Sequence, residues 1–251
     1  MKTQPVFACL FIGLLLAGCA TQAGSPISGP AQSVLAGSPP TRPVVGDTAV
    51  YRIRNGYSGE AHGEIQYRVE KIDGDKVVMS VTTSTPSAGL PHLEIYTTDG
   101  NWLRHPIVSH DRPVDYDFAP PYPAYAFPLD FGKSWSVRVN ATNLATGKRN
   151  SVRVDGEVLG GERVSTPAGA FDTIKVKRRV YAGDWDGFLY ETNLTEVDWY
   201  APALGRAVRT ERNSGWLDKS RSPGGGSLLG RNDQMMYGDW SVYELVSHTR
   251  N

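Results

Sequence analysis

Residues 163–181 have the sequence RVSTPAGAFDTIKVKRRVY, and this stretch decides the fold class. Apolar and polar side chains alternate on both sides of a Pro-Ala-Gly turn, and a period of two is the pattern of half-buried β-strands. Pro167 fixes φ and Gly169 lets the chain reverse, so the two halves form an antiparallel hairpin. We expect the ring of Phe171 to point inward at the start of the second strand.

The same alternation recurs from Gly46 onward, with no convincing helical stretch. Turns rich in Gly, Asp, Asn and Pro separate about a dozen strands. They are expected near residues 49–54, 65–70, 77–81, 93–98, 102–108, 134–142, 151–159, 163–165, 171–181, 188–200, 205–211 and 239–247, with Gly160-Gly161 joining the seventh to the eighth. The chain is therefore predicted to be all-β: one antiparallel sheet over residues 46–251, strongly curved or closed like a barrel.

Composition narrows the function classes. The chain has 251 residues, 26 basic and 26 acidic side chains and a formal net charge of zero, so it lacks the basic surface typical of nucleic-acid binders. Charged residues at 21% and aromatic residues at 10% also exclude global disorder. A length of this size is compatible with a single all-β domain.

The amino terminus carries a targeting signal. Lys2 precedes an apolar run over residues 6–16 that is too short for a transmembrane helix, and the run ends in Leu16-Ala17-Gly18-Cys19. This arrangement resembles the lipobox of bacterial lipoproteins, in which the chain is cut before the cysteine and the cysteine is acylated. The resemblance implies a signal peptide over residues 1–18 and a lipidated Cys19; the alternative is a plain secretory or uncleaved signal.

The resemblance also implies a location. Two or more acyl chains, such as palmitate, give stable membrane anchoring. Ala20 stands where an Asp would commonly retain such a protein at the inner membrane, which favours the outer membrane and a periplasm-facing domain. Residues 19–45 are rich in small and polar residues and are expected to be a flexible linker, about 25–30 Å in mean length. Loss of Cys9 with the signal leaves Cys19 alone, so no disulfide is expected.

Three segments of the second half carry a further resemblance. Residues 167–176 resemble a PAGxFDTxKV segment, residues 199–209 a WYAPxLGRxVR segment, and residues 132–135 a GxxW strand start. Together they are similar to bacterial envelope proteins with a β-rich domain of unknown function. The resemblance covers about residues 130–212 and transfers no catalytic residue. In physical terms, Pro202 blocks strand continuation and Gly205 permits the reversal that follows it.

Catalytic motifs are not found. H-E-x-x-H and G-x-S-x-G are absent, and no cofactor or metal is expected. A metal or acid–base role for the neighbouring His105 and His110, with Asp111, Asp115 and Asp117, is less favoured than solvated loop charges. Asp184-Trp185-Asp186-Gly187 fits a hairpin turn better than a calcium or sugar site. Residues 218–234, with their Pro-Gly-Gly-Gly run, fit a surface loop.

The stretch at residues 109–131, SHDRPVDYDFAPPYPAYAFPLDF, is unusual. Its five prolines predict that no central strand runs here, and its six aromatic residues need a place to pack. A loop across the mouth of a curved sheet would satisfy both, with its rings over an apolar interior. The candidate ligand contacts are Trp102, Tyr116, Phe118, Tyr122, Tyr125, Phe127 and Trp135. The alternative is a filled barrel in which the same rings are a permanent plug.

These observations favour a non-catalytic binding or carrier module for an apolar ligand or envelope component. The alternative is a structural or assembly lipoprotein that contacts other envelope proteins through exposed aromatic side chains. An enzyme is the least favoured class. A contiguous apolar cavity would favour the carrier, exposed rings without a cavity would favour assembly, and convergent ionisable groups in a cleft would favour an enzyme.

Lipidation at Cys19 is directly testable. We expect the mature chain to begin at Cys19 with acyl chains attached, as mass spectrometry of the amino-terminal peptide would show. A Cys19→Ala variant should leave the membrane fraction with an unchanged far-ultraviolet spectrum, because the anchor is separate from the fold. An unmodified Cys19, or cleavage elsewhere, contradicts the prediction.

Overall fold

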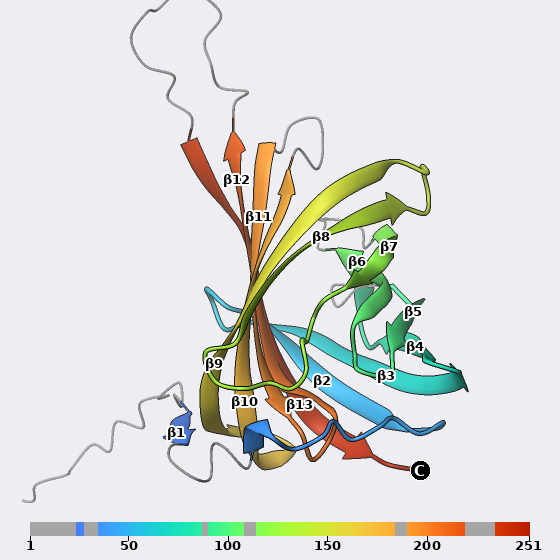
Figure 1. Ribbon diagram of the computed structural model, residues 1–251, viewed down its shortest axis with the longest axis vertical. Coiled ribbons are helices and arrows are strands. Elements are labelled where there is room, and N and C mark those ends of the chain that lie inside the picture. The colour runs from blue at the N-terminus through green and yellow to red at the C-terminus, as the bar shows by residue number, and fades with distance from the viewer. Residues whose placement is uncertain (1–23, 28–34, 87–89, 108–113, 184–189, 219–233) are drawn as a thin grey trace, which may run out of the picture.

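The computed structural model describes residues 24–27, 35–86, 90–107, 114–183, 190–218 and 234–251. Within these ranges the regular elements are thirteen β-strands (Figure 1). They are Ser25–Ile27 (β1), Thr48–Asn55 (β2), Ala61–Asp73 (β3), Lys76–Thr83 (β4), His92–Thr97 (β5), Trp102–Ile107 (β6), Val114–Tyr122 (β7), Ser134–Asn143 (β8), Arg149–Thr166 (β9), Gly169–Gly183 (β10), Tyr190–Ala201 (β11), Arg206–Asp218 (β12) and Gln234–Thr249 (β13). No helix within the described ranges is long and apolar enough to cross a membrane.

The strands form one closed antiparallel barrel of twelve strands, with β1 attached outside the ring. The order runs from β9 through β13 to β2 and on to β8, and β8 pairs again with β9. The predicted all-β class is confirmed, and the sheet closes rather than ending in two edges. The last strand pairs with β12 on one side and β2 on the other, as expected, so the two ends of the barrel sequence meet.

The decisive hairpin has the predicted form. β9 and β10 pair antiparallel from Gly169 opposite Thr166 onward, and Val176 and Val180 are buried while Arg179 is exposed. One detail differs, because Gly160-Gly161 does not separate two strands. These glycines lie inside the 18-residue β9, beside a register shift that inserts an extra residue opposite β10. The backbone flexibility of the two glycines therefore serves a β-bulge rather than a turn.

The prediction that no central strand runs through residues 109–131 is wrong. β7 pairs with both β6 and β8, although residues 108–113 lie outside the described ranges. Pro120 and Pro121 are tolerated because they fall where the ladder is interrupted. Asp117 pairs with Arg104 and Tyr122 with Trp102, so four residues of β7 lie opposite one residue of β6. Both prolines also follow Ala119, the last residue of β7 that pairs with β8, and no ladder donor is lost.

Residues 35–47, which we call the N-terminal strap, run along one end of the barrel (Figure 1). Thr41 donates from its backbone nitrogen and from Oγ1 to the carbonyl oxygen of Pro202, at 3.4 and 2.8 Å. The Ala201–Arg206 turn is the predicted reversal, and Gly205 has φ +67° there. A Cβ on Gly205 would overlap the carbonyl oxygen of Thr41, so glycine serves both the turn and the close approach of the strap.

The segment predicted as a flexible linker is therefore not free along its whole length. Ser25–Ile27 pairs with β9, opposite Arg163 to Gly161, and Thr41 is fixed to the turn before β12. Only four residues separate Cys19 from Gly24, so five Cα–Cα steps limit their span to roughly 18 Å. The distance between the proposed anchor at Cys19 and the barrel is thus shorter than a linker disordered over residues 19–45 would give.

Closure of the ring depends on β13. Removing residues 237–251 should leave β2 and β12 as open edges and abolish cooperative thermal unfolding, since most of the β13 pairing is lost. Removing only Arg250 and Asn251, which follow β13, is the control and should preserve the transition. A cooperative melt with a native circular dichroism spectrum in the longer truncation would contradict a continuous ring.

Candidate functional site

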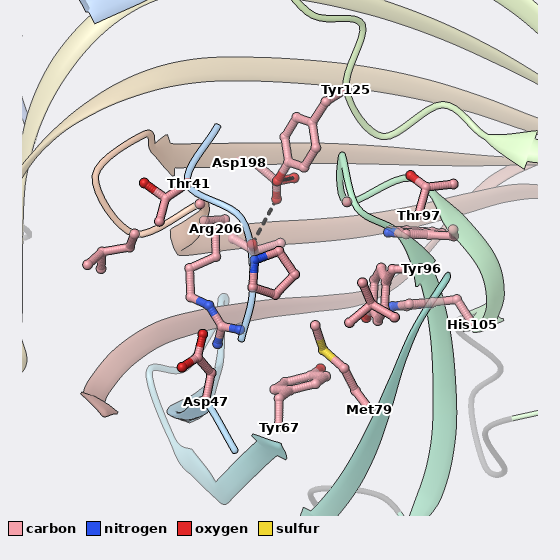
Figure 2. Close-up of a pocket in the computed structure, with 18 of the residues that line it drawn as sticks. Thr41, Asp47, Tyr67, Met79, Tyr96, Thr97, His105, Tyr125, Asp198 and Arg206 are labelled. Carbon is pink, nitrogen blue, oxygen red and sulfur yellow. Dashed lines mark hydrogen bonds between the residues drawn. The ribbon is translucent and has the colours of Figure 1, made fainter. Parts of the chain in front are cut away.

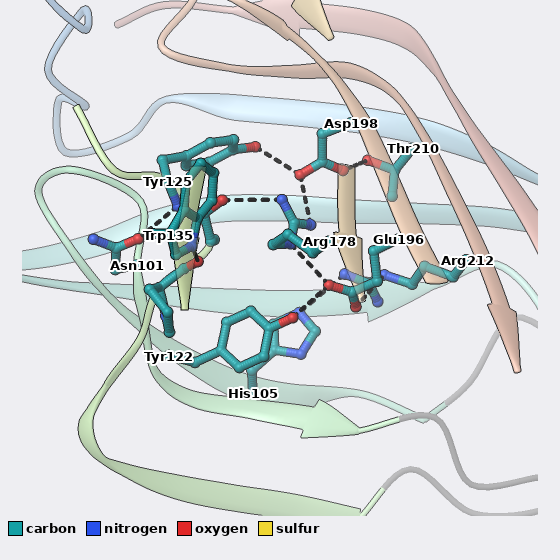
Figure 3. Close-up of polar contacts among 12 residues, drawn as sticks. Asn101, His105, Tyr122, Tyr125, Trp135, Arg178, Glu196, Asp198, Thr210 and Arg212 are labelled. Carbon is teal, nitrogen blue, oxygen red and sulfur yellow. Dashed lines mark hydrogen bonds and ion pairs between the residues drawn. The ribbon is translucent and has the colours of Figure 1, made fainter. Parts of the chain in front are cut away.

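A network of charged side chains lies inside the barrel, and Arg178 of β10 is its centre (Figure 3). Its guanidinium is completely buried and donates from Nε to Glu196 at 3.0 Å and from Nη2 to Asp198 at 2.8 Å. A third bond runs from Nη1 to the carbonyl oxygen of Ala124 at 3.0 Å. The two carboxylates come from β11, where alternate positions face the same side. One cation therefore compensates two buried acids.

Hydroxyl groups also donate to the two acids, and the two tyrosines share with Arg178 the oxygen that it contacts on each acid. Tyr122 donates to Glu196 at 2.7 Å, and Tyr125 donates to Asp198 at 2.9 Å. Thr210 of β12 donates to the other oxygen of Asp198 at 2.7 Å. Burial alone would raise the pKa of Asp198, but the charge of Arg178 and the hydrogen bonds from Thr210 and Arg178 outweigh it and hold the pKa below its ordinary value.

A second cluster surrounds Glu94, which is also buried. Nε2 of His92 lies 2.9 Å from this carboxylate, and the hydroxyl of Tyr96 donates to it. His105 lies next to both clusters. Its Nδ1 is 2.6 Å from the carbonyl oxygen of Pro106 and must donate there, which leaves Nε2 to accept from Arg212 at 3.4 Å. Burial lowers the pKa of His105 to about 4, so the ring is neutral at pH 7.

Stacked rings connect the two clusters. The indole of Trp102 lies between the rings of His105 and Tyr122, with centroid distances of 3.9 and 4.1 Å. The guanidinium carbon of Arg212 lies 5.4 Å from the Trp102 ring and 5.4 Å from the Tyr243 ring. The polar interior is thus packed between aromatic faces, which limits the access of water and strengthens each interaction.

A cavity of about 150 Å³ adjoins this network (Figure 2). Its aromatic wall consists of Tyr51, Tyr67, Tyr96, Trp102, Tyr125 and Tyr243, and Val77 and Met79 add an aliphatic patch. Thr41 and Pro43 of the N-terminal strap form another wall, near Asp47, Arg206 and His248. The expected apolar interior is therefore only half right, because rings and aliphatic groups share the cavity with charged side chains.

The predicted ligand contacts separate into two groups. Trp102, Tyr116, Phe118, Tyr122 and Tyr125 are buried, whereas Phe127 and Trp135 are half-buried against the same core. Of these seven, Trp102 and Tyr125 line the cavity. Tyr122 has only 1% of its surface exposed and Tyr125 only 9%, and both hydroxyls are committed to buried carboxylates. This placement favours the plug over the removable loop, while a role of the seven residues in ligand binding stays a prediction.

The His and Asp candidates do not converge. His110 and Asp111 lie outside the described residues, as do Asp184-Trp185-Asp186-Gly187 and residues 219–233. Asp117 pairs with Arg104 through two bonds of 2.7 and 3.0 Å, and His105 is turned into the network. No group of three or more His, Cys, Asp or Glu side chains suited to a metal occurs in the described part of the chain.

Sequence reasoning missed the charged centre: Arg178, Glu196, Asp198, Arg212 and Glu94. A signal was present in the strand period. Arg178 lies two residues from both Val176 and Val180, on the face that those buried valines define, and Glu196 lies two residues after buried Leu194. A charged side chain at an inward position of a strand indicates a buried ion pair or a site.

Comparison with known proteins identifies the fold. No protein-family profile matches the chain, and no curated protein matches it. A solved structure described as a putative lipoprotein from Parabacteroides distasonis ATCC 8503 is similar, with a TM-score of 0.50 and 18% identity over 83% of this chain and 97% of that chain. This similarity shows that the same barrel fold occurs in a protein of known structure.

Two solved structures have lower TM-scores. One is described as a putative exported protein with YmcC-like fold from Bacteroides fragilis NCTC 9343, with a TM-score of 0.46 and 17% identity over 85% of this chain and 100% of that chain. The other is the hypothetical lipoprotein YmcC from Escherichia coli (K12), with a TM-score of 0.42 and 10% identity over 81% of this chain and 85% of that chain.

The network makes a stability prediction. Arg178→Met should lower the free energy of unfolding at pH 7 by about 3–5 kcal/mol, because Glu196 and Asp198 stay buried without their cation. Arg179→Met, on the exposed face of the same strand, is the control and should change it by less than about 0.5 kcal/mol. Denaturant unfolding measures both.

The pH dependence gives a second measure of the same change. Asp198 has a lowered pKa in the native protein, so its contribution to stability is present near neutral pH and is lost as the pH falls through that pKa. Without Arg178, burial raises the pKa of Asp198, and protonation of this carboxylate then stabilises the folded state. The difference in free energy of unfolding between the native protein and Arg178→Met should therefore shrink between pH 7 and pH 4. A difference that stays constant over this range would contradict the charge argument.

Proposed function

We propose that this protein is a lipid-anchored envelope lipoprotein whose barrel acts as a non-catalytic binding module for a small, largely apolar ligand. The observation that carries the proposal is the cavity of about 150 Å³ with its wall of six aromatic rings. An apolar cavity of about that size holds one benzene molecule in a well-studied protein. The ligand, or the part of it that enters, is accordingly no larger than a single ring.

The pairing of the ionisable groups supports binding rather than catalysis. The cluster does converge beside a cavity, which is the feature that would favour an enzyme. However, Arg178 compensates Glu196 and Asp198, His92 pairs with Glu94, and neutral His105 uses both ring nitrogens in hydrogen bonds. A general acid or base needs a free position toward the substrate and a pKa near the working pH.

The path of the amino-terminal segment supports an anchored module. The N-terminal strap contributes Thr41 and Pro43 to the cavity wall, and β1 lies at the same end of the barrel as the strap (Figure 1). If Cys19 is lipidated, the short segment before Gly24 keeps that end of the barrel near the membrane. Outer-membrane attachment with a periplasm-facing barrel belongs to this proposal, on the strength of Ala20.

An assembly role is the second candidate, and one surface feature favours it. Tyr57 and Tyr237 are 58% and 78% exposed, and Met235 nearby on β13 is 48% exposed. Tyr57 lies close to the same strand, because its hydroxyl donates to the carbonyl oxygen of Gly238 at 3.4 Å. Exposed rings of this kind are common where proteins contact one another.

Filling the cavity tests the binding module. Ethylbenzene, followed by ligand-observed NMR with the purified full chain, should bind the native protein, and Ala207→Phe should weaken that binding at least tenfold by occupying the cavity. Ala170→Phe, on an exposed position of β10, is the matched control and should leave binding unchanged. Equal signals from all three proteins would place the probe outside the cavity and contradict the proposal.

A further inference from the structure

The charges around the cavity balance in pairs. Arg178 and Arg212 lie beside Asp198 and Glu196, with Nε of Arg212 at 3.7 Å from Glu196. Arg206 and Asp47 add one charge of each sign to the lining. Because the charged side chains that line the cavity sum to zero, an ionised ligand would add a net charge to a partly buried site, and such a charge is costly. The electrostatics therefore favour a neutral ligand.

The two carboxylates and the buried His105 in the cavity wall already accept hydrogen bonds. Asp198 accepts from Arg178, Tyr125 and Thr210. Asp47 accepts from the backbone nitrogens of Val44 and Asn251, at 2.9 and 3.1 Å. The accepting nitrogen of His105 faces Arg212. A ligand that offers only hydrogen-bond donors would find these three acceptors already in use.

Donors, in contrast, remain available. In the described part of the chain, the hydroxyls of Tyr67 and Tyr243 have no hydrogen-bond partner, although both side chains line the cavity. Among the described residues Arg212 makes a single hydrogen bond, to His105, and its buried Nε has no hydrogen-bond partner, although Glu196 lies 3.7 Å away. Tyr51 differs, because its hydroxyl already donates to the carbonyl oxygen of Ala207 at 2.7 Å.

These donors occupy one region of the wall. Tyr243, Tyr51 and Tyr67 come from β13, β2 and β3, which are consecutive in the barrel. The Tyr51 and Tyr67 rings are 5.7 Å apart, and Arg212 lies over the Tyr243 ring. Figure 2 shows Tyr67 beside Met79, so the donors adjoin an apolar surface. Burial holds the pKa of Tyr67 well above its ordinary value, which keeps this hydroxyl protonated as a donor.

We propose that the cavity selects a neutral molecule with a carbonyl acceptor, such as an ester, amide or ketone, next to a ring-sized apolar group. The carbonyl oxygen accepts from Tyr67 and Tyr243, with Arg212 adjacent, and the apolar part lies against Met79 and Trp102. The assignment rests on the proposed binding function and adds to it the polarity and charge of the ligand.

The test compares probes of similar shape on the purified full chain: acetophenone as neutral acceptor, ethylbenzene without polar atoms, benzoate as anion and 1-phenylethylamine as cation. Acetophenone is expected to bind, and Tyr67→Phe combined with Tyr243→Phe should weaken it about tenfold, as expected for the loss of two modest hydrogen bonds. Ethylbenzene binding should not change in this double variant. Tyr51→Phe, whose hydroxyl is already used, is the matched control and should leave acetophenone binding unchanged.

The outcomes separate the two proposals. If ethylbenzene binds in a manner that Ala207→Phe blocks, but acetophenone is insensitive to the double tyrosine variant, the carbonyl assignment fails and the binding module stands. Benzoate or the amine binding as tightly as acetophenone would overturn the charge-balance argument. If no probe occupies the cavity, both proposals fail. Thermal melts of each variant establish that a lost signal reflects binding rather than unfolding.

Discussion

Arg178 must stay paired with Glu196 and Asp198, because all three side chains are inside the barrel and none can reach bulk water. A ring of twelve strands encloses more space than an eight-stranded barrel, whose interior side chains can just fill it. Here long polar side chains cross the interior, and tyrosine hydroxyls from residues 122 and 125 complete their hydrogen bonds. The ion pairs thereby tie β10 and β11 to the segment that follows β7. Breaking these ion pairs would leave three buried charges without their partners and would destabilise the folded state.

This constraint explains the unusual composition of residues 114–131. The end of β7 separates from β8 and bulges away from β6 before Tyr122 pairs and stacks with Trp102 and Tyr125 reaches Asp198. Prolines suit that departure, since they need no ladder partner. The aromatic side chains that the sequence assigned to a ligand-covering loop thus fill the interior of the barrel around Arg178.

The sequence was sufficient for the fold class, most strand positions and the corners at Pro167 and Gly205, since these depend on local alternation and turn chemistry. It was insufficient for the site. Glu196 lies opposite Arg178 in the β10–β11 pairing, but the tyrosines are more than 50 residues away from Arg178, so only the closed ring brings them to this strand pair. β7 was missed because proline was treated as excluding a strand, whereas a local bulge removes the conflict. The inward position of Arg178 between two valines was the one local sign of a charged interior.

The cavity lies where the charged network gives way to the second apolar cluster, around Tyr51, Leu245 and Trp199. On the network side every acid has hydrogen-bond donors, while on the other side the hydroxyls of Tyr67 and Tyr243 have no acceptor among the residues that the structure describes. A space between a saturated network and unused donors is chemically asymmetric. The proposed preference for a carbonyl acceptor rests on that asymmetry rather than on the volume of the cavity. The N-terminal strap closes part of the same space, and its fit against Gly205 fixes Thr41 beside the cavity. The N-terminal strap is therefore also part of the cavity wall.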